Sequence, residues 1–374
     1  MNSLPERIKI GVFSKPLDNW MSGSGHHLDE MMRHILDLND SEGNPFEFTF
    51  IHYKKSENPV YSRVKELLIP RNPLAASSVI RKLGFSILHY SPLSIYAPMF
   101  RIKAKKIATI HGAEEVIYPQ GYSLIARLHE KWVMPILARR LDRIATVSET
   151  SKNYYVSVYK VPDEKIFLTV NGVSPEYHVL DKAALKVPEK LGITNPYIFH
   201  ISRYSMRKNP EGILGGFSVF SEKHPEFRLV CAGKGWDGEE VRGFAREFHI
   251  EDKLITPGFV SETDCAELLN GASAFLFPSF AEGFGMPNVE AMACGCPVVT
   301  SSVFAIPEVV GDAAVLLKDE RNAEECGAAL EHIVTDKAFA AELVRRGLER
   351  VKRYDWNRSA AALMKVYHEL AEAT

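Results

Sequence analysis

The sequence has few of the features that mark membrane-spanning, disulfide-bonded or metal-binding proteins. No apolar run reaches the roughly 18 residues that a membrane span needs, and the start of the chain, MNSLPERIKIGVF, lacks the apolar core of a signal peptide. The five cysteines form no C-x-x-C pair of the kind that binds metal, and their odd number argues for reduced thiols. These absences predict a cytoplasmic protein.

Length and composition predict a globular protein of two domains. With 374 residues, the chain is too long for one ordinary hydrophobic core. Its 46% hydrophobic and 25% charged residues are typical of globular enzymes and binding proteins. Both of these classes stay open on composition alone.

Basic residues are concentrated in one part of the first half of the chain. The net charge is −2, yet residues 51–143 hold 16 Lys and Arg against 6 Asp and Glu. Such a segment suits an anionic acceptor or an anionic membrane; the alternative is a solvated surface rich in Lys and Arg. The amphipathic stretch 123–141, with an expected kink at Pro135, likewise suits either a membrane surface or the face of a sheet. Its basic residues are Arg127, Lys131, Arg139 and Arg140.

The first half of the chain alternates predicted strands and helices. The strand 8–13 is followed by Ser22-Gly23-Ser24-Gly25-His26-His27, which we interpret as a glycine-rich loop before a helix. Such loops hold nucleotides or sugars in doubly wound folds, although a plain tight turn would look the same. His111 directly follows the predicted strand 106–110, where it would point to a ligand or serve a structural purpose. The other strands predicted in this half are 46–53, 86–90, 143–147 and 167–170.

The same rhythm restarts after a proline-containing stretch at 174–196, the best linker candidate. Two successive strand–helix series predict two doubly wound α/β domains that face each other across a cleft. We place the domains at 1–185 and 186–355, with a C-terminal helix over 356–374. The strands predicted in the second half are 197–201, 228–232, 254–257, 274–277, 298–301 and 314–317.

Glycines and charged residues follow several of these later strands. Arg203 and Lys208 lie between a strand and a helix, where both could reach one phosphate group. Gly233 lies in a loop that a ligand could approach closely, and Phe259 with Val260 could pack against a planar base. Their ordered occurrence at strand ends indicates a ligand site rather than a purely structural need.

The densest of these motifs runs from Phe277 to Thr300. Its loop, Glu282-Gly283-Phe284-Gly285, lets backbone amides approach a ligand closely. Pro287 suits the first turn of a short helix, whose free amides would attract an anion. Glu290 lies about one turn into that helix, so Glu282 and Glu290 could contact opposite ends of one extended ligand.

These motifs together resemble those of the family 4 retaining glycosyltransferases, which have the GT-B fold. Glu282 and Glu290 are similar to the family's two glutamates separated by seven residues. The resemblance covers nearly the full chain, is most specific over 197–311, and includes the break at Tyr354-Asp355-Trp356 before a C-terminal helix that crosses back to the first domain. The other matching segments are Gly23-Ser24-Gly25-His26, His111-Gly112, Asn171-Gly172-Val173, Ser202-Arg203 with Lys208, Ala232-Gly233-Lys234-Gly235 and Pro257-Gly258-Phe259-Val260.

The resemblance implies a role for each matching residue. Arg203 and Lys208 would grip the diphosphate, Glu282 would lie near the donor sugar, and His111 near the sugar and acceptor. These four are the predicted catalytic residues, and Glu290 would accept hydrogen bonds from the ribose. The predicted donor-binding residues are Gly23, Gly25, Gly233, Phe259, Val260, Gly283, Phe284, Gly285 and Glu290.

The resemblance further implies a retaining hexosyltransferase that moves a sugar from a UDP- or GDP-sugar to a saccharide or lipid-linked acceptor, in polysaccharide or glycolipid biosynthesis. We find no D-x-D pair, so we expect neither a metal nor another cofactor. Expected partners are the donor, the acceptor and, through the basic first domain, the inner face of an anionic membrane, but no nucleic acid. The alternatives are a sugar-nucleotide epimerase of the same fold and a non-catalytic nucleotide-sugar-binding protein.

Overall fold

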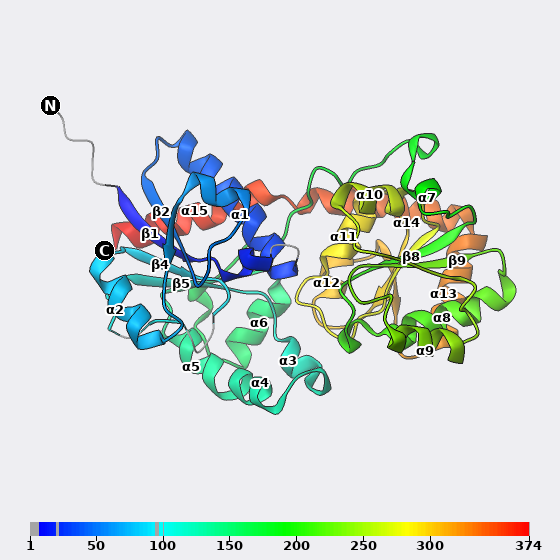
Figure 1. Ribbon diagram of the computed structural model, residues 1–374, viewed down its shortest axis with the longest axis horizontal. Helices are drawn as coiled ribbons and strands as arrows, with labels where there is room; N and C mark the ends of the chain where they lie inside the picture. Colours follow the sequence, from blue (N-terminus) through cyan, green and yellow to red (C-terminus); the bar gives the residue numbers. More distant parts are fainter. Residues whose placement is uncertain (1–6, 20–21, 94–96, 100, 374) are drawn as a thin grey trace. The chain divides into compact units, whose positions relative to one another are not determined.

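The computed structural model describes residues 7–19, 22–93, 97–99 and 101–373, which form two compact units (Figure 1). Unit 1 holds the described residues up to 116, residues 123–172 and those from 355 onward; unit 2 holds residues 117–122 and 173–354. The stretch 173–185, assigned to the first domain from the sequence, folds with unit 2. Residues 1–6 and Thr374, which belong to the predicted terminal segments, lie outside the described residues.

The described part of unit 1 is built on a seven-stranded parallel sheet in the order β3-β2-β1-β4-β5-β6-β7. Its central strands are buried on both faces, as expected when helices cover a parallel sheet. The strands are β1 (Ile8–Phe13), β2 (Phe46–His52), β3 (Lys65–Leu68), β4 (Ile87–Tyr90), β5 (Lys105–Ile110), β6 (Arg143–Thr146) and β7 (Ile166–Leu168).

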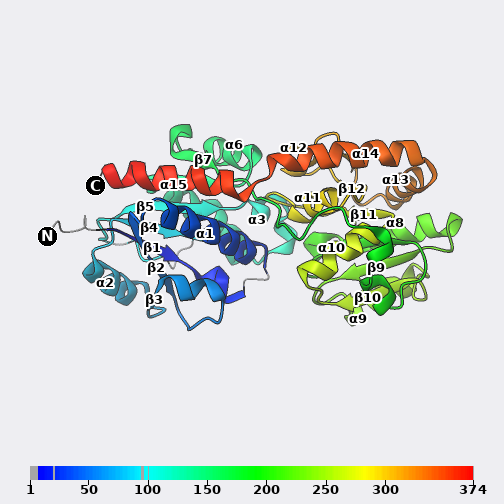
Figure 2. The same ribbon diagram turned by 90° about the horizontal axis from the view of Figure 1, so that it is seen from above.

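Helices cover both faces of this sheet. Ile80, Ala138 and Tyr155, from three different helices, share one core cluster with strand residues such as Leu88. Figure 2 shows α15, the last helix of the chain, lying alongside α1. The helices are α1 (Gly23–Ser41), α2 (Pro73–Leu83), α4 (Leu124–Leu128), α5 (Met134–Arg139), α6 (Glu149–Ser157) and α15 (Trp356–Glu372), while α3 (Glu114–Ile117) crosses the boundary between the units.

Unit 2 repeats the winding order of the first six strands of unit 1, β10-β9-β8-β11-β12-β13, and all pairs are parallel. Its strands are β8 (Tyr197–Ile201), β9 (Arg228–Ala232), β10 (Leu254–Gly258), β11 (Ala274–Phe277), β12 (Val298–Ser301) and β13 (Ala314–Leu317). The predicted class, two doubly wound α/β domains, is confirmed.

The helices of unit 2 also lie on both faces of its sheet. In Figure 1, α10 and α11 lie on one face and α8, α9 and α13 on the other. The helices are α7 (Val187–Lys190), α8 (Pro210–Lys223), α9 (Glu239–Glu247), α10 (Glu262–Gly271), α11 (Met286–Ala293), α12 (Ile306–Val310), α13 (Ala323–Thr335) and α14 (Lys337–Arg350).

One local prediction in unit 1 is wrong. The expected loop Ser22–His27 is largely the first turn of α1, which begins at Gly23. The Ser22 side chain caps this turn, because its hydroxyl accepts a hydrogen bond from the Gly25 amide at 3.2 Å. Glycine has a low helix propensity, but one good N-cap supplies an acceptor to the amides of the first turn and allows the helix to start earlier than composition indicates.

Candidate functional site

A buried carboxylate with two cations lies in unit 2 where the winding order of its sheet reverses. β8 and β11 are neighbours there, yet the chain leaves them toward opposite faces, and ligands of doubly wound folds bind at such a point. The segment after β8 carries Lys208 and the segment after β11 carries Glu282. Lys208 Nζ donates to Glu282 Oε1 at 2.5 Å, so the structure brings these two predicted site residues together.

A second cation, Arg207, shares the same carboxylate. Its Nη1 lies 3.1 Å from Glu282 Oε1 and donates to the Ala281 carbonyl. Sequence reasoning selected Arg203 instead, whose side chain is exposed in the structure. The available signal was that Arg207 directly precedes Lys208 in the sequence, so both side chains could reach one site from the same short turn, Met206–Lys208.

Glu282 is ionised at neutral pH although it is buried. Burial alone would raise the pKa of this carboxyl group, but Arg207 and Lys208 outweigh it and hold the pKa below its ordinary value. The Lys208 ammonium also lies 4.7 Å from the centre of the Phe277 ring. The cluster therefore carries two positive charges against one negative charge.

The glycine loop after Glu282 leads directly into the start of α11. Gly285 has a φ of 85° and occupies the N-cap position without a side-chain cap for the helix amides. Phe284 is buried with its ring edge against Tyr354, at 5.3 Å between centroids. Asn288 in the first turn is fully buried, and neither atom of its amide has a hydrogen-bond partner among the described residues. This loop presents an uncapped helix start beside two cations, an arrangement that suits an anion.

Glu290 lies further along α11 and is half-buried. Its carboxylate contributes, after burial, to raising the pKa of the Tyr177 phenol and the Cys265 thiol, so it lies near both groups. Its assignment to the ribose hydroxyls stays a prediction, as does the assignment of Glu282 to the sugar.

Two neighbouring strand ends carry the other predicted donor-binding residues of unit 2. Gly233 has a φ of 109°, and a Cβ there would lie 2.0 Å from the Ser202 carbonyl oxygen, so this loop requires glycine for its own fold. Phe259 is exposed and Val260 half-buried directly after β10. An exposed phenyl ring at a strand end could pack against a planar base, as the sequence predicted.

A cluster of uncharged aromatic side chains lies at the strand ends of unit 1. His111 follows β5, and its ring meets that of His27 edge to face at 4.6 Å. The amide oxygen of Asn171 accepts from His27 Nδ1 at 2.6 Å, which fixes the proton of His27 on Nδ1. Burial, followed by the influence of His89, lowers the pKa of His111 to about 4. His111 is therefore neutral at pH 7, and its Nε2 has no hydrogen-bond partner among the described residues.

The two predicted glycines of unit 1 lie in the first turn of α1, next to this cluster in the sequence. Gly25 is buried, whereas a Cβ at Gly23 would meet no atom within 4 Å. Packing within the described residues thus does not explain glycine at position 23. The close approach of a ligand to this backbone would explain it.

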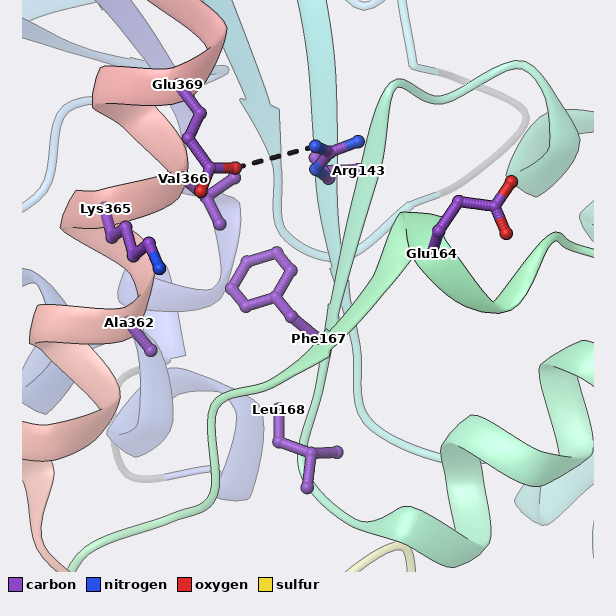
Figure 3. A pocket seen from close by; sticks show the side chains of 8 residues that line it. All are labelled: Arg143, Glu164, Phe167, Leu168, Ala362, Lys365, Val366 and Glu369. Carbon is purple, nitrogen blue, oxygen red and sulfur yellow. Dashed lines mark ion pairs between the residues drawn. The ribbon is translucent and has the colours of Figure 1, made fainter.

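A separate pocket of unit 1 contains none of the predicted site residues. It measures about 270 Å³ and lies between the β6–β7 region and α15 (Figure 3). Arg143 and Glu369 pair across it at 3.5 Å. The side chains that line it belong to Arg143, Glu164, Phe167, Leu168, Ala362, Lys365, Val366 and Glu369.

None of the helices in the described residues is both long and apolar enough to cross a membrane.

Two family models match the chain. The model of Glycosyltransferase Family 4 matches residues 34–177, and the model described as Glycosyl transferases group 1 matches residues 181–350. The two matches follow one another along the chain, and the second contains all the predicted site residues of the second half.

Individual proteins are similar over nearly the full chain. O-antigen chain mannosyltransferase B of Escherichia coli is 30% identical over 96% of this chain and 99% of its own length. Sucrose-phosphate synthase from Thermosynechococcus elongatus has a similar fold, with a TM-score of 0.79 and 20% identity over 98% of this chain and 100% of its own. An Anabaena protein solved in complex with UDP and glucose gives a TM-score of 0.79 and 16% identity over 97% and 100%. The chain therefore belongs to the family 4 glycosyltransferases with the GT-B fold, enzymes that transfer a sugar from a nucleotide-sugar donor.

Proposed function

We propose that this protein is a retaining, metal-independent mannosyltransferase. It would move mannose from a nucleoside-diphosphate-mannose to a saccharide or lipid-linked saccharide acceptor in polysaccharide synthesis. The observation that carries the proposal is the likeness to O-antigen chain mannosyltransferase B, which extends over 99% of that relative. The charged cluster of unit 2 supplies the matching chemistry.

Cleavage of a sugar–diphosphate bond leaves negative charge on the departing phosphate. Lys208, Arg207 and the uncapped start of α11 lie together at the sheet reversal point, so they can stabilise that charge. Arg203, exposed four residues earlier, would add a third cation to the bound diphosphate. Two to three fixed positive charges could do here what a divalent cation does elsewhere, which supports metal independence.

Glu282 and His111, the two predicted catalytic residues with lowered pKa values, would act as hydrogen-bonding groups. Glu282 stays ionised at neutral pH, so it can accept a hydrogen bond from a sugar hydroxyl but cannot serve as a general acid. His111 stays neutral, so it can bond to a hydroxyl without attracting the diphosphate. In the proposed step the acceptor's hydroxyl oxygen bonds to the anomeric carbon on the face from which the phosphate oxygen departs, and that phosphate takes the hydroxyl proton, so the anomeric configuration is retained.

The donor is the first point to test. A thermal-shift screen would compare mannose linked to GDP, UDP and ADP with UDP-glucose, because a ligand that binds the folded state raises the melting temperature by mass action. We expect GDP- or UDP-mannose to give the largest shift and, with a mannose-containing acceptor, to release nucleoside diphosphate at an equal rate with and without EDTA. Isomerised donor without any acceptor would instead indicate an epimerase. Tight nucleotide binding without turnover of any acceptor would indicate a binding protein.

A further inference from the structure

An apolar stripe lies exposed on the segment that runs from α4 into α5. Five of the thirteen large hydrophobic side chains that are exposed in the described residues fall within this one short segment. Single exposed apolar residues are ordinary, but a contiguous group of them marks an interaction surface. We call these five residues the α4–α5 stripe: Leu124 (65% exposed), Ile125 (81%), Leu128 (47%), Trp132 (62%) and Ile136 (47%).

The backbone of the segment keeps the stripe on one side. Four of its members are four residues apart, a spacing that drifts around an α-helix of about 3.6 residues per turn. Between α4 and α5 the chain forms a π-turn, His129–Val133, in which the Met134 amide bonds to the His129 carbonyl. A π-turn takes more residues per turn and so reduces the drift. The opposite side is anchored, because Met134 and Ala138 are buried in the core of unit 1.

The exposed charged residues of the segment 123–141 have one sign. All four basic residues of the segment are exposed, and Lys131 Nζ lies 5.3 Å from the centre of the Trp132 ring. The single acidic residue, Glu130, is buried and accepts a hydrogen bond from the Tyr159 hydroxyl. The exposed face therefore combines large apolar side chains with positive charge only. The basic residues are Arg127, Lys131, Arg139 and Arg140.

We propose that the α4–α5 stripe docks the protein onto an anionic lipid membrane, with the segment lying in the interfacial plane. Leucine, isoleucine and tryptophan side chains would enter the headgroup and acyl boundary, while Arg and Lys pair with lipid phosphates. Tryptophan suits this boundary because its ring is apolar and its N–H remains able to bond to water. A protein partner or a second copy of this chain would cover apolar side chains equally well. Neither, however, accounts for the fact that all exposed charged residues of the segment are basic.

The proposal concerns unit 1 and does not depend on which donor unit 2 binds. Vesicle flotation of the full chain without donor or acceptor therefore tests it apart from the transferase chemistry. Vesicles of phosphatidylcholine alone are compared with vesicles in which part of it is replaced by phosphatidylglycerol. We expect binding to the anionic vesicles only, weakened when salt is raised from about 0.1 M to about 1 M, because the Debye length falls from about 10 Å to about 3 Å.

The variants separate apolar insertion from charge. Leu124→Asn with Ile125→Asn should lower vesicle binding at least about tenfold, on the scale of keeping two large side chains out of the lipid without adding charge. Arg139→Glu with Arg140→Glu should lower it by a similar factor. Leu74→Asn is the matched control, because Leu74 on α2 is 68% exposed but lies outside the stripe. This variant should bind as the parent does.

Trp132 gives a direct readout of insertion. Of the four tryptophans, Trp236 and Trp356 are buried, whereas Trp132 is exposed. Anionic vesicles should therefore shift the emission of the parent to shorter wavelength, and Trp132→Phe should abolish most of this shift while retaining binding. No binding by the parent, equal binding to neutral vesicles, or unchanged binding by the apolar variant would each overturn the proposal. Conversion of a dimer to a monomer by the apolar variant would also overturn it, in favour of contact between copies.

Discussion

The two units wind their sheets in the same order, yet different side chains occupy the ends of their strands. Unit 2 places Lys208 and Arg207 around the ionised Glu282, whereas unit 1 places His27 against His111, both with lowered pKa values. A charged cluster can stabilise a diphosphate, and a neutral cluster can bond to hydroxyl groups without attracting phosphate. One architecture can thus carry two kinds of recognition, because recognition depends on the residues at the strand ends and not on the order of the strands.

The largest effect should come from removing the carboxylate of unit 2. Glu282→Ala leaves two cations without their partner in a buried place, which should destabilise unit 2 by about 3–5 kcal/mol. Urea unfolding, with amide hydrogen exchange of β8 and β11 as the local readout, measures this. Glu331→Ala is the control, because it removes one member of the exposed Lys223–Glu331 pair (2.7 Å) and should cost less than about 1 kcal/mol. Equal losses in the two variants would contradict a special charged cluster in unit 2.

Removal of one cation should affect catalysis more than folding. We expect Lys208→Ala to lower the turnover number by about 10²-fold or more, as for the loss of one preorganised donor to a developing charge. The control is Lys223→Ala, which removes the same side chain from a surface pair and should keep the parent's rate. Circular dichroism confirms that both variants fold. A folded Lys208→Ala enzyme with nearly full turnover would remove Lys208 from the phosphate site.

A mildly acidic pH should destabilise unit 1 more than unit 2. The pKa of His111 is lowered to about 4, and burial lowers those of His27 and His89 too, whereas an unfolded histidine titrates near 6.5. Unfolded unit 1 therefore binds more protons below about pH 6.5, so its stability is complete above that pH and falls as the pH drops toward 4.

Hydrogen exchange, corrected for the intrinsic rate at each pH, measures this effect. Between pH 7 and pH 5 the protection of β4 and β5 should fall more than that of β8 and β11, because burial lowers the pKa values of His27, His89 and His111 in unit 1 and that of His200 in unit 2. Equal loss of protection in the two sheets would show that the neutral histidines do not distinguish the units.

The smallest effect on stability should come from Gly23→Ala. This substitution places a Cβ in open space in the first turn of α1, so the free energy of unfolding should stay equal or rise by up to about 1 kcal/mol. A melting curve measures this change. If the donor approaches this backbone closely, turnover should nevertheless fall. Gly233→Ala provides the contrast, because its Cβ would overlap the Ser202 carbonyl and should prevent normal folding of unit 2. Unchanged turnover in Gly23→Ala would remove Gly23 from the donor site.

Most of the fold could be predicted because buried parallel strands are short apolar runs bounded by turn residues. The predicted bounds of Tyr197–Ile201 and Ala274–Phe277 match the observed strands. β3 (Lys65–Leu68) was not predicted, since it is an edge strand with mostly exposed side chains and no buried face to produce a pattern. Pro135, where a kink was expected, lies in the first turn of α5, directly after the π-turn His129–Val133. Helix propensity alone does not reveal such a turn.

The candidate site could be predicted in part for a similar reason. Lys208 and Glu282 were found because each follows a strand, and the reversal of the winding order brings them together. Arg207 was missed because a linear sequence does not show which of several cations in one turn faces the carboxylate. His27 was also missed as the neighbour of His111, because it lies in a helix that was predicted to begin after it. Contacts between distant segments need the register of the sheet, which sequence patterns do not supply.

The packing of α15 on unit 1 affects the order in which the two units can fold during synthesis. α15 packs along α1, the Tyr367 hydroxyl lies 2.7 Å from His89 Nδ1 inside the sheet, and Ser359 Oγ donates to the Val170 carbonyl at 2.6 Å. Residues 355–373 follow unit 2 along the chain, so they leave the ribosome after it, although most of unit 1 leaves before it. Unit 1 therefore keeps α1 uncovered until α15 has been synthesised, whereas unit 2 does not include α15. A released chain truncated after residue 354 should accordingly bind nucleotide while its N-terminal half stays sensitive to protease.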